Sequence, residues 1–113
     1  MLIFGIQDAQ KVLEEDSMLE AYADMHLGGV ILFEKNIAKK RSKNQLKALV
    51  DEIQSISKIP SFIAIDEEGG NVSRLKPGYG FHETKTAKYL GNKNNLDSTY
   101  FFAKLTSDLL KEL

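Results

Sequence analysis

The chain alternates short apolar runs with stretches in which apolar residues recur at helical spacing. The apolar runs cover residues 2–6, 30–33 and 61–65, and the second is apolar on both alternations, as in a strand covered on both faces. Residues 9–25, and the stretch that follows residue 44, carry apolar positions three and four apart. Strand, helix, strand, helix, strand in this order predicts an α/β fold with parallel strands, either in an open sheet or as the first part of a barrel.

The two central helices have sequence signals at their ends. Asp8 is the expected cap of the first helix, Ser42 or Asn44 that of the second, and Pro60 stops the second helix. The regularly spaced aliphatic residues of the second helix should form its buried face: Leu46, Leu49, Val50, Ile53 and Ile56.

The last part of the chain is predicted to hold a long loop and a final helix. Residues 67–95 form an irregular stretch around Pro77 that is longer than a compact domain normally uses for a connection, so it is either functional or poorly ordered. Residues 96–113 are expected to be helical, with Asp97 or Ser98 as the cap. The apolar residues expected to form the buried face of this helix are Phe101, Phe102, Leu105, Leu109 and Leu110.

The charge balance argues against a nucleic-acid partner. The chain has 15 basic and 16 acidic residues and a net charge of -1, so no global field attracts it to a polyanion. Basic residues gather in residues 34–43, but no aromatic residues interleave with them, which favours a solvated loop. There is no cysteine, which rules out disulfides and thiol chemistry and removes the commonest structural zinc ligands.

Hydropathy predicts no membrane span, because every apolar run is far shorter than the roughly 20 residues that cross a bilayer. The first residues have no basic leader and no small-residue cleavage site. A cytoplasmic location is therefore the expectation for the sequence as written, and a periplasmic or secreted location stays open if a leader was trimmed.

The third strand leads into the segment with the clearest chemistry, residues 63–75. In a parallel α/β fold the carboxyl ends of strands face the ligand site, which places Asp66 there. Its carboxylate could accept two hydroxyl hydrogen bonds from a sugar. The glycine pair Gly69 and Gly70 lets the backbone turn sharply, and Arg74 can return to offer a planar fork of donors to the same ligand or to hold Asp66.

Other roles for these residues are weighed against that hypothesis. A capped turn in which Asp66 simply bonds to Arg74 is an equally good interpretation from physics alone. A metal site is not expected, since nothing marks the further oxygen ligands that a divalent cation needs. The neighbouring acids cannot flank one scissile bond, because adjacent strand residues point to opposite faces. His26 and His82 are expected to be structural, since neither has neighbours that complete a triad or a metal set.

Four segments carry motifs whose order and spacing are informative: residues 28–37, 45–49, 65–75 and 87–91. The first contains a Gly-Gly-Val-Ile-Leu-Phe block, and the third an acid-acid-Gly-Gly block followed by Val-x-Arg. Together they resemble the amino-terminal domain of glycoside hydrolase family 3, of the β-N-acetylhexosaminidase (β-N-acetylglucosaminidase) type, over nearly the whole chain. The acid-acid-Gly-Gly block with Val-x-Arg is fairly specific, and the Gly-Gly-Val-Ile-Leu-Phe block points toward the N-acetylglucosaminidase branch.

The resemblance implies a fold, an activity and two site residues. The fold is a TIM (β/α)8 barrel, of which this single amino-terminal portion, residues 1–113, would supply the first units, since a complete barrel takes roughly 250 residues. The implied activity is retaining hydrolysis of a terminal β-linked N-acetylhexosamine or β-glucoside. Asp66 and Arg74 match the residues that bind hydroxyls of the innermost sugar. No catalytic residue, metal or cofactor is assigned to this chain, because the family's nucleophile and acid/base residue lie later in the barrel.

Two alternative functions remain open, and association with further copies of the chain is expected. The chain could be a catalytically silent sugar-binding or assembly module, or an unrelated α/β domain in which Asp66 and Arg74 are structural. A partial barrel leaves an unpaired strand edge and an apolar face, so a homo-oligomer is predicted.

Overall fold

A parallel sheet forms the base of the molecule. The computed structural model describes residues 2–6, 24 and 28–113. Its strands are β1 (Ile3–Gly5), β2 (Gly29–Leu32) and β3 (Phe62–Ile65), in the spatial order β1-β2-β3 with both pairings parallel. The register sets Ile3 beside Gly29 and Leu32 beside Ile65. The α/β class and the parallel order are thus as predicted. Of the predicted helix over residues 9–25 only Asp24 is described, and its cap Asp8 and His26 lie outside the described residues.

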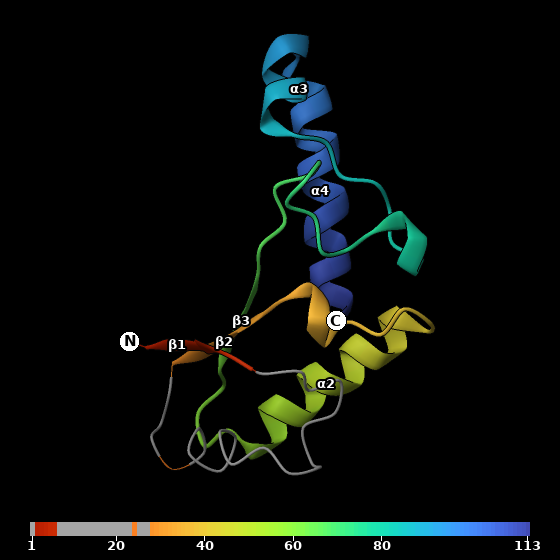
Figure 1. Cartoon of the computed structure of the whole chain (residues 1–113). Coiled ribbons are helices and arrows are strands. Elements are labelled where there is room, and N and C mark those ends of the chain that lie inside the picture. The colour runs from red at the N-terminus through yellow and green to blue at the C-terminus, as the bar shows by residue number, and fades with distance from the viewer. Residues whose placement is uncertain (1, 7–23, 25–27) are drawn as a thin grey trace.

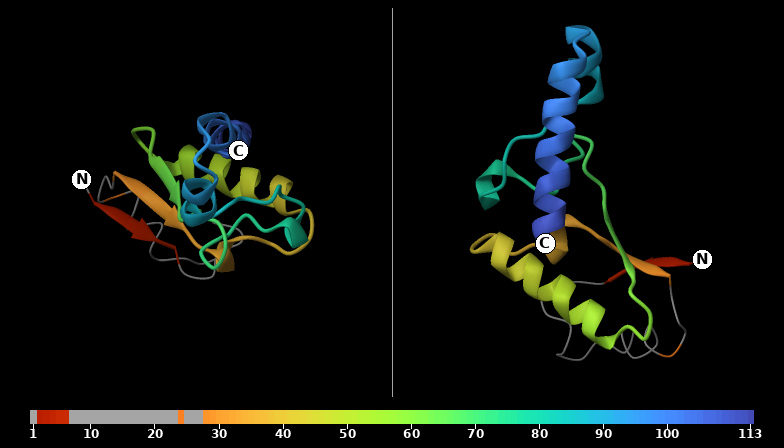
Figure 2. Two further views of the ribbon diagram at one scale, coloured as in Figure 1. Left: turned by 90° about the horizontal axis from the view of Figure 1, so that it is seen from above. Right: turned by 180° about the vertical axis from the view of Figure 1, so that it is seen from behind.

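Helix α2 (Ser42–Ile56) packs against the sheet and supplies much of the core (Figure 2). Its buried positions Leu46, Leu49 and Ile53 are 2%, 1% and 0% exposed, while Val50 and Ile56 are partly buried against the same cluster, as the spacing predicts. The core is completed by apolar residues of the strands, of the later loops and of the last helix: Ile6, Val30, Leu32, Ile37, Leu75, Phe81 and Leu109.

The predicted cap of α2 was wrong. Arg41 holds the cap position with a left-handed φ of 52° and no side-chain capping hydrogen bond. Ser42 is the first helical residue and is only 2% exposed, and Asn44 already lies inside the helix. A cap must precede the first helical residue, so neither side chain can serve. The helix ends at Ile56, before Pro60, as expected.

The stretch predicted to be irregular contains two short helices. They are the 3-10 turn η2 (Pro77–Tyr79) and the α-helix α3 (Ala87–Lys93). The Thr86 hydroxyl accepts a 3.1 Å hydrogen bond from the Tyr89 backbone N–H, which caps α3. The truly irregular part is therefore residues 66–86, interrupted by η2.

Helix α4 (Leu96–Glu112) begins where predicted, but its cap and its buried face differ from the prediction. Asn95, not Asp97 or Ser98, is the cap: its side chain accepts a 2.8 Å hydrogen bond from the Ser98 backbone N–H. Leu109 is buried, and Phe102 and Leu105 are half-buried. Phe101 and Leu110 are 56% and 45% exposed.

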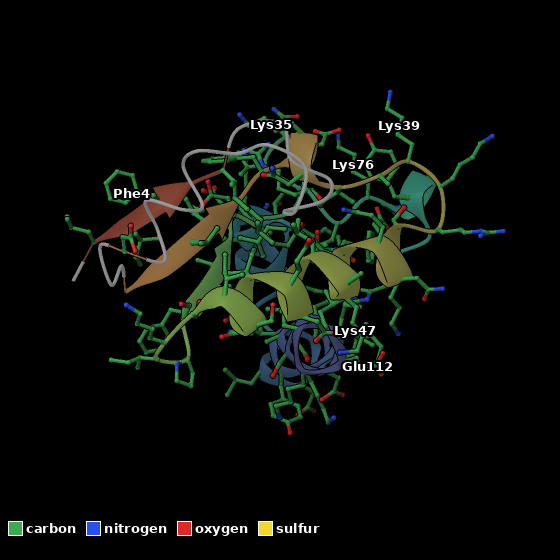
Figure 3. All side chains as sticks on the ribbon, turned by 90° about the horizontal axis from the view of Figure 1, so that it is seen from below. Phe4, Lys35, Lys39, Lys47, Lys76 and Glu112 are labelled. Carbon is green, nitrogen blue, oxygen red and sulfur yellow. The ribbon has the colours of Figure 1, made fainter. Side chains whose placement is uncertain are left out.

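The position of α4 accounts for the exposure of Phe101 in its first half. Figure 1 shows α4 rising away from the sheet, with α3 beside its far end and the C-terminus close to α2. Lys43 of α2 forms an ion pair with Glu112 in the last turn of α4. Figure 3 views this junction from below, with Glu112 labelled. Only the last turns of α4 therefore reach the core, and spacing alone could not show how far the helix extends beyond it.

No helix in the described part of the chain is long and apolar enough to cross a membrane.

Candidate functional site

The carboxyl ends of β2 and β3 lie at the same edge of the sheet, and acidic residues follow both. Asp66 comes directly after β3 and is exposed. Glu34 comes two residues after the end of β2, at the start of the 3-10 turn η1 (Glu34–Asn36). The candidate site is built where these two chain segments meet residues 67–79.

A tight glycine turn follows Asp66. Gly69 and Gly70 both adopt positive φ, 76° and 63°, which side chains with a Cβ rarely adopt. The Glu68 backbone N–H donates to the Val72 carbonyl at 2.8 Å, and an antiparallel bridge joins Gly69 to Val72. The turn reverses the chain, so Arg74 returns toward the strand from which Asp66 leaves.

The glycine turn packs closely on a later segment of the chain. A Cβ added to Gly69 would lie 2.6 Å from the Lys85 carbonyl carbon, and one added to Gly70 would lie 2.6 Å from Thr86 Cγ2. Both contacts are shorter than van der Waals distance. The two glycines are thus required for close approach as well as for backbone conformation.

Glu67 holds the two arms of the turn together. Its Oε2 accepts hydrogen bonds from the backbone N–H groups of Arg74 at 2.8 Å and Leu75 at 2.9 Å. Its Oε1 accepts one from the Thr84 hydroxyl at 2.7 Å. Burial alone would raise the pKa of the Glu67 carboxyl, but these hydrogen bonds, with one from Ser73, outweigh burial and hold the pKa below its ordinary value. Glu67 is therefore an ionised structural acceptor at neutral pH.

Asp66 and Arg74 are both described, but no hydrogen bond or ion pair joins them within the described residues. The alternative in which these two side chains simply bond to each other is therefore not what the structure shows. Arg74 is half-buried, and its Nε is a buried donor with no acceptor among the described residues. A buried donor without a partner is costly, so the Arg74 Nε–H has hydrogen-bonding capacity that the described part of the chain does not use.

Glu34 connects the end of β2 to the segment after Arg74. Its Oε1 accepts from Lys76 Nζ at 2.6 Å and from the Tyr79 hydroxyl at 2.7 Å. The hydrogen bonds from Lys76 and Tyr79 are the main reason that the pKa of Glu34 is lowered, and the charge of Arg74 adds to the effect. The same contacts raise the pKa values of Lys76 and Tyr79. Figure 3 labels Lys76 and shows Lys39 projecting outward from the nearby loop.

Asn36 is a buried polar residue that joins the ends of β1 and β2. Its side chain is fully buried, accepts a 2.8 Å hydrogen bond from the Phe33 backbone N–H and donates one of 3.3 Å to the Ile6 carbonyl. Sequence patterns did not point to Asn36, Glu34 or Glu67 as site residues. An acid or amide just past a strand end is the signal that could have found them.

Two hollows lie beside these segments. One of about 520 Å³ lies between the 67–68 and 84–85 segments and α4, and one of about 670 Å³ lies between Tyr79 and the 34–40 loop. Neither is lined by Asp66 or Arg74. Among the described residues no group of acidic or histidine side chains could hold a metal ion. His82 is half-buried within the 81–86 segment.

Comparison with protein families places the chain clearly. The model of the glycosyl hydrolase family 3 N terminal domain matches residues 7–112. A beta-hexosaminidase of Alkalilimnicola ehrlichii is 37% identical over 78 residues, which is 69% of this chain and 21% of that protein. A beta-hexosaminidase of Actinobacillus pleuropneumoniae is 35% identical over 99 residues, which is 88% of this chain and 27% of that protein.

Solved structures show the same likeness. A glycoside hydrolase family 3 beta-N-acetylglucosaminidase from Paenibacillus sp. superposes with a TM-score of 0.83 at 26% identity, over 97% of this chain and 20% of that one. NagZ from Neisseria gonorrhoeae, in complex with N-trifluoroacetyl-D-glucosamine, superposes with a TM-score of 0.69 at 30% identity, over 85% of this chain and 26% of that one.

The chain therefore spans only about a quarter of the length of these relatives. Within that span the resemblance seen in the sequence is confirmed, and the parallel α/β arrangement is that of the opening part of the family's barrel domain. The chain belongs to the glycosyl hydrolase family 3 N-terminal domain family, and its relatives include beta-hexosaminidases.

Proposed function

We propose that this chain supplies part of the sugar-binding subsite of a retaining β-N-acetylhexosaminidase. In this proposal Asp66 and Arg74 bind hydroxyl groups of the terminal N-acetylhexosamine, and the nucleophile and acid/base residue come from parts of the barrel beyond the matched segments. Family membership and the beta-hexosaminidase relatives support the reaction class.

The observation that carries the proposal is that the Asp66 carboxylate and the Arg74 Nε have no hydrogen-bond or ion-pair partner among the described residues. Asp66 presents an exposed carboxylate at the carboxyl edge of the sheet, and Arg74 has a buried Nε that lacks an acceptor among the described residues. A carboxylate accepts and a guanidinium donates, so together they suit the vicinal hydroxyls of a sugar, which do both. A purely structural pair would be expected to use these groups on each other.

Binding of N-acetylglucosamine, followed by NMR titration, tests the role of the two residues. Asp66→Ala and Arg74→Ala should each weaken binding by about tenfold or more, because each removes a charge-assisted hydrogen bond. Asp51→Ala on the outer face of α2 and Lys88→Ala on α3 are matched controls that should leave binding unchanged, since both residues are exposed. Unchanged binding in the two site variants, or lost thermal stability in place of lost binding, would favour a structural role.

Turnover of a chromogenic N-acetylglucosaminide separates an enzyme from a silent sugar-binding module. We expect binding without turnover by this chain alone, because the proposal places the nucleophile elsewhere. Hydrolysis by the purified chain would contradict that division of roles.

We also propose that the chain associates with a second copy of itself. The outer strand β3 and the loop before it expose large apolar side chains, with Phe62 66% and Ile59 70% exposed, and β3 has β2 on one side only among the described strands. Such edges favour pairing with another chain. Light scattering should give at least a dimeric mass, and a monomeric mass that persists as concentration rises would contradict self-association.

A further inference from the structure

Glu67 differs from the other acids of the site because its side chain binds the backbone. One carboxylate oxygen accepts two consecutive backbone N–H groups, those of Arg74 and Leu75, and the other accepts the Thr84 hydroxyl. Glu67 follows Asp66 directly in the chain, and its first partner is the N–H of Arg74 itself. The contact thus fixes the backbone of Asp66 relative to that of Arg74. It uses the side chain of neither residue.

The anchor beyond Arg74 is rigid, which makes this contact effective. Leu75 is 1% exposed and belongs to the hydrophobic core, so its N–H is a fixed point. On the other side, Gly69 packs against the Lys85 backbone and Thr84 donates to Glu67. The Asp66–Arg74 turn is therefore held to the core and to the 84–86 segment through one carboxylate.

The chemistry of the contact suits a carboxylate that keeps its charge. Two N–H donors converge on Oε2, and a charged acceptor strengthens both hydrogen bonds. A glutamine could keep the geometry, because its carbonyl oxygen can accept both N–H groups while its NH₂ group donates to the Thr84 oxygen, which can accept. An alanine would leave two partly buried N–H groups without their acceptor.

We propose that Glu67 is a positioning residue that sets the separation and orientation of Asp66 and Arg74 for a carbohydrate ligand. This inference rests on the proposed function, since it concerns the same two side chains. The proposed role of Glu67 is exerted through the backbone of the turn and needs no contact with the sugar.

The test compares the affinity of four variants for N-acetylglucosamine with that of the full chain. Glu67→Ala should weaken binding about tenfold, and Glu67→Gln should restore it to within about threefold of the original, because only the alanine loses the hydrogen bonds to the turn. Glu68→Ala is the matched control, an exposed acid one residue along whose side chain makes no hydrogen bond or ion pair with the described residues, and its affinity should not change. Thr84→Val removes the third hydrogen bond alone and should weaken binding about threefold.

The outcomes separate this inference from the proposed function. If the original chain and the Glu67→Ala variant bind the sugar equally, the positioning role is overturned while Asp66 and Arg74 keep theirs. A Glu67→Gln variant as weak as the alanine variant also overturns it, because hydrogen-bond geometry would then not be what matters. If the original chain binds no N-acetylglucosamine, both proposals fall. Should Glu67→Ala not fold, Thr84→Val decides: unchanged affinity contradicts the positioning role, and reduced affinity with unchanged thermal stability supports it.

Discussion

Replacing Gly69 by alanine separates two reasons for a glycine in the turn. The backbone φ of 76° carries a left-handed penalty of about 1–2 kcal/mol for any residue with a Cβ. The new methyl group would also lie 2.6 Å from the Lys85 carbonyl carbon and 2.7 Å from its oxygen, and these backbone atoms cannot rotate away. Overpacking of this kind costs about 1–3 kcal/mol, so the Gly69→Ala variant should lose about 2–5 kcal/mol of unfolding free energy.

Gly80 supplies the matched control for that experiment. Its φ of 89° is also left-handed, but a Cβ added there meets nothing within 4 Å. Gly80→Ala should therefore show the conformational cost alone, about 1–2 kcal/mol. Urea unfolding followed by far-ultraviolet circular dichroism measures both variants. If they lose the same free energy within about 0.5 kcal/mol, the close contact with Lys85 does not exist in solution and the account of the turn is refuted.

Three further predictions test other parts of the structure. Asn36→Ala should cost about 2–4 kcal/mol in urea unfolding, because it leaves the partly buried Phe33 N–H and the buried Ile6 carbonyl without these partners. A cost below about 0.5 kcal/mol would show that water replaces the amide. Tyr79 donates to Glu34, which raises the pKa of its phenol, so this contact stabilises the fold below the ordinary tyrosine pKa and is lost as pH rises through the raised value. Absorbance titration should therefore show a late tyrosinate step that Tyr79→Phe removes and Glu34→Gln shifts to lower pH, and a titration curve that Glu34→Gln does not change would contradict this. Asn95→Ala should cost about 0.5–2 kcal/mol through loss of the α4 cap, whereas Asp97→Ala should cost less if Asn95 is the cap.

The features that the sequence could predict are those carried by local spacing. The spacing of Leu46, Leu49 and Ile53 predicts the buried face of helix α2. The location of Asp66 at the edge of the sheet follows from the strand order, because parallel strands bring their carboxyl ends to one edge. Family resemblance came from motif order and was confirmed by the match over residues 7–112.

The features that the sequence could not predict depend on distant partners. Glu67 accepts hydrogen bonds from backbone N–H groups seven and eight residues away. Nearly every residue has a backbone N–H, so a sequence pattern cannot show which of them will be the donor. Phe101 has the right spacing for a buried face but is 56% exposed, so its exposure is a property of the tertiary arrangement. Helix α3 is short, and several polar residues in that stretch could equally well have been its cap from the sequence alone. In the structure the cap is Thr86.

Helix α4 is packed against the core only near its C-terminal end among the described residues. Leu109 is buried in the core and Lys43 pairs with Glu112 in the last turn of α4, whereas Leu96 in its first turn is 88% exposed and α3 packs beside α4. Protection of its backbone amides against deuterium exchange should therefore increase steadily from the free end toward Leu109, because local opening is easiest where few side chains are packed. Uniform protection along the whole of α4 would mean that other contacts stabilise its first turns.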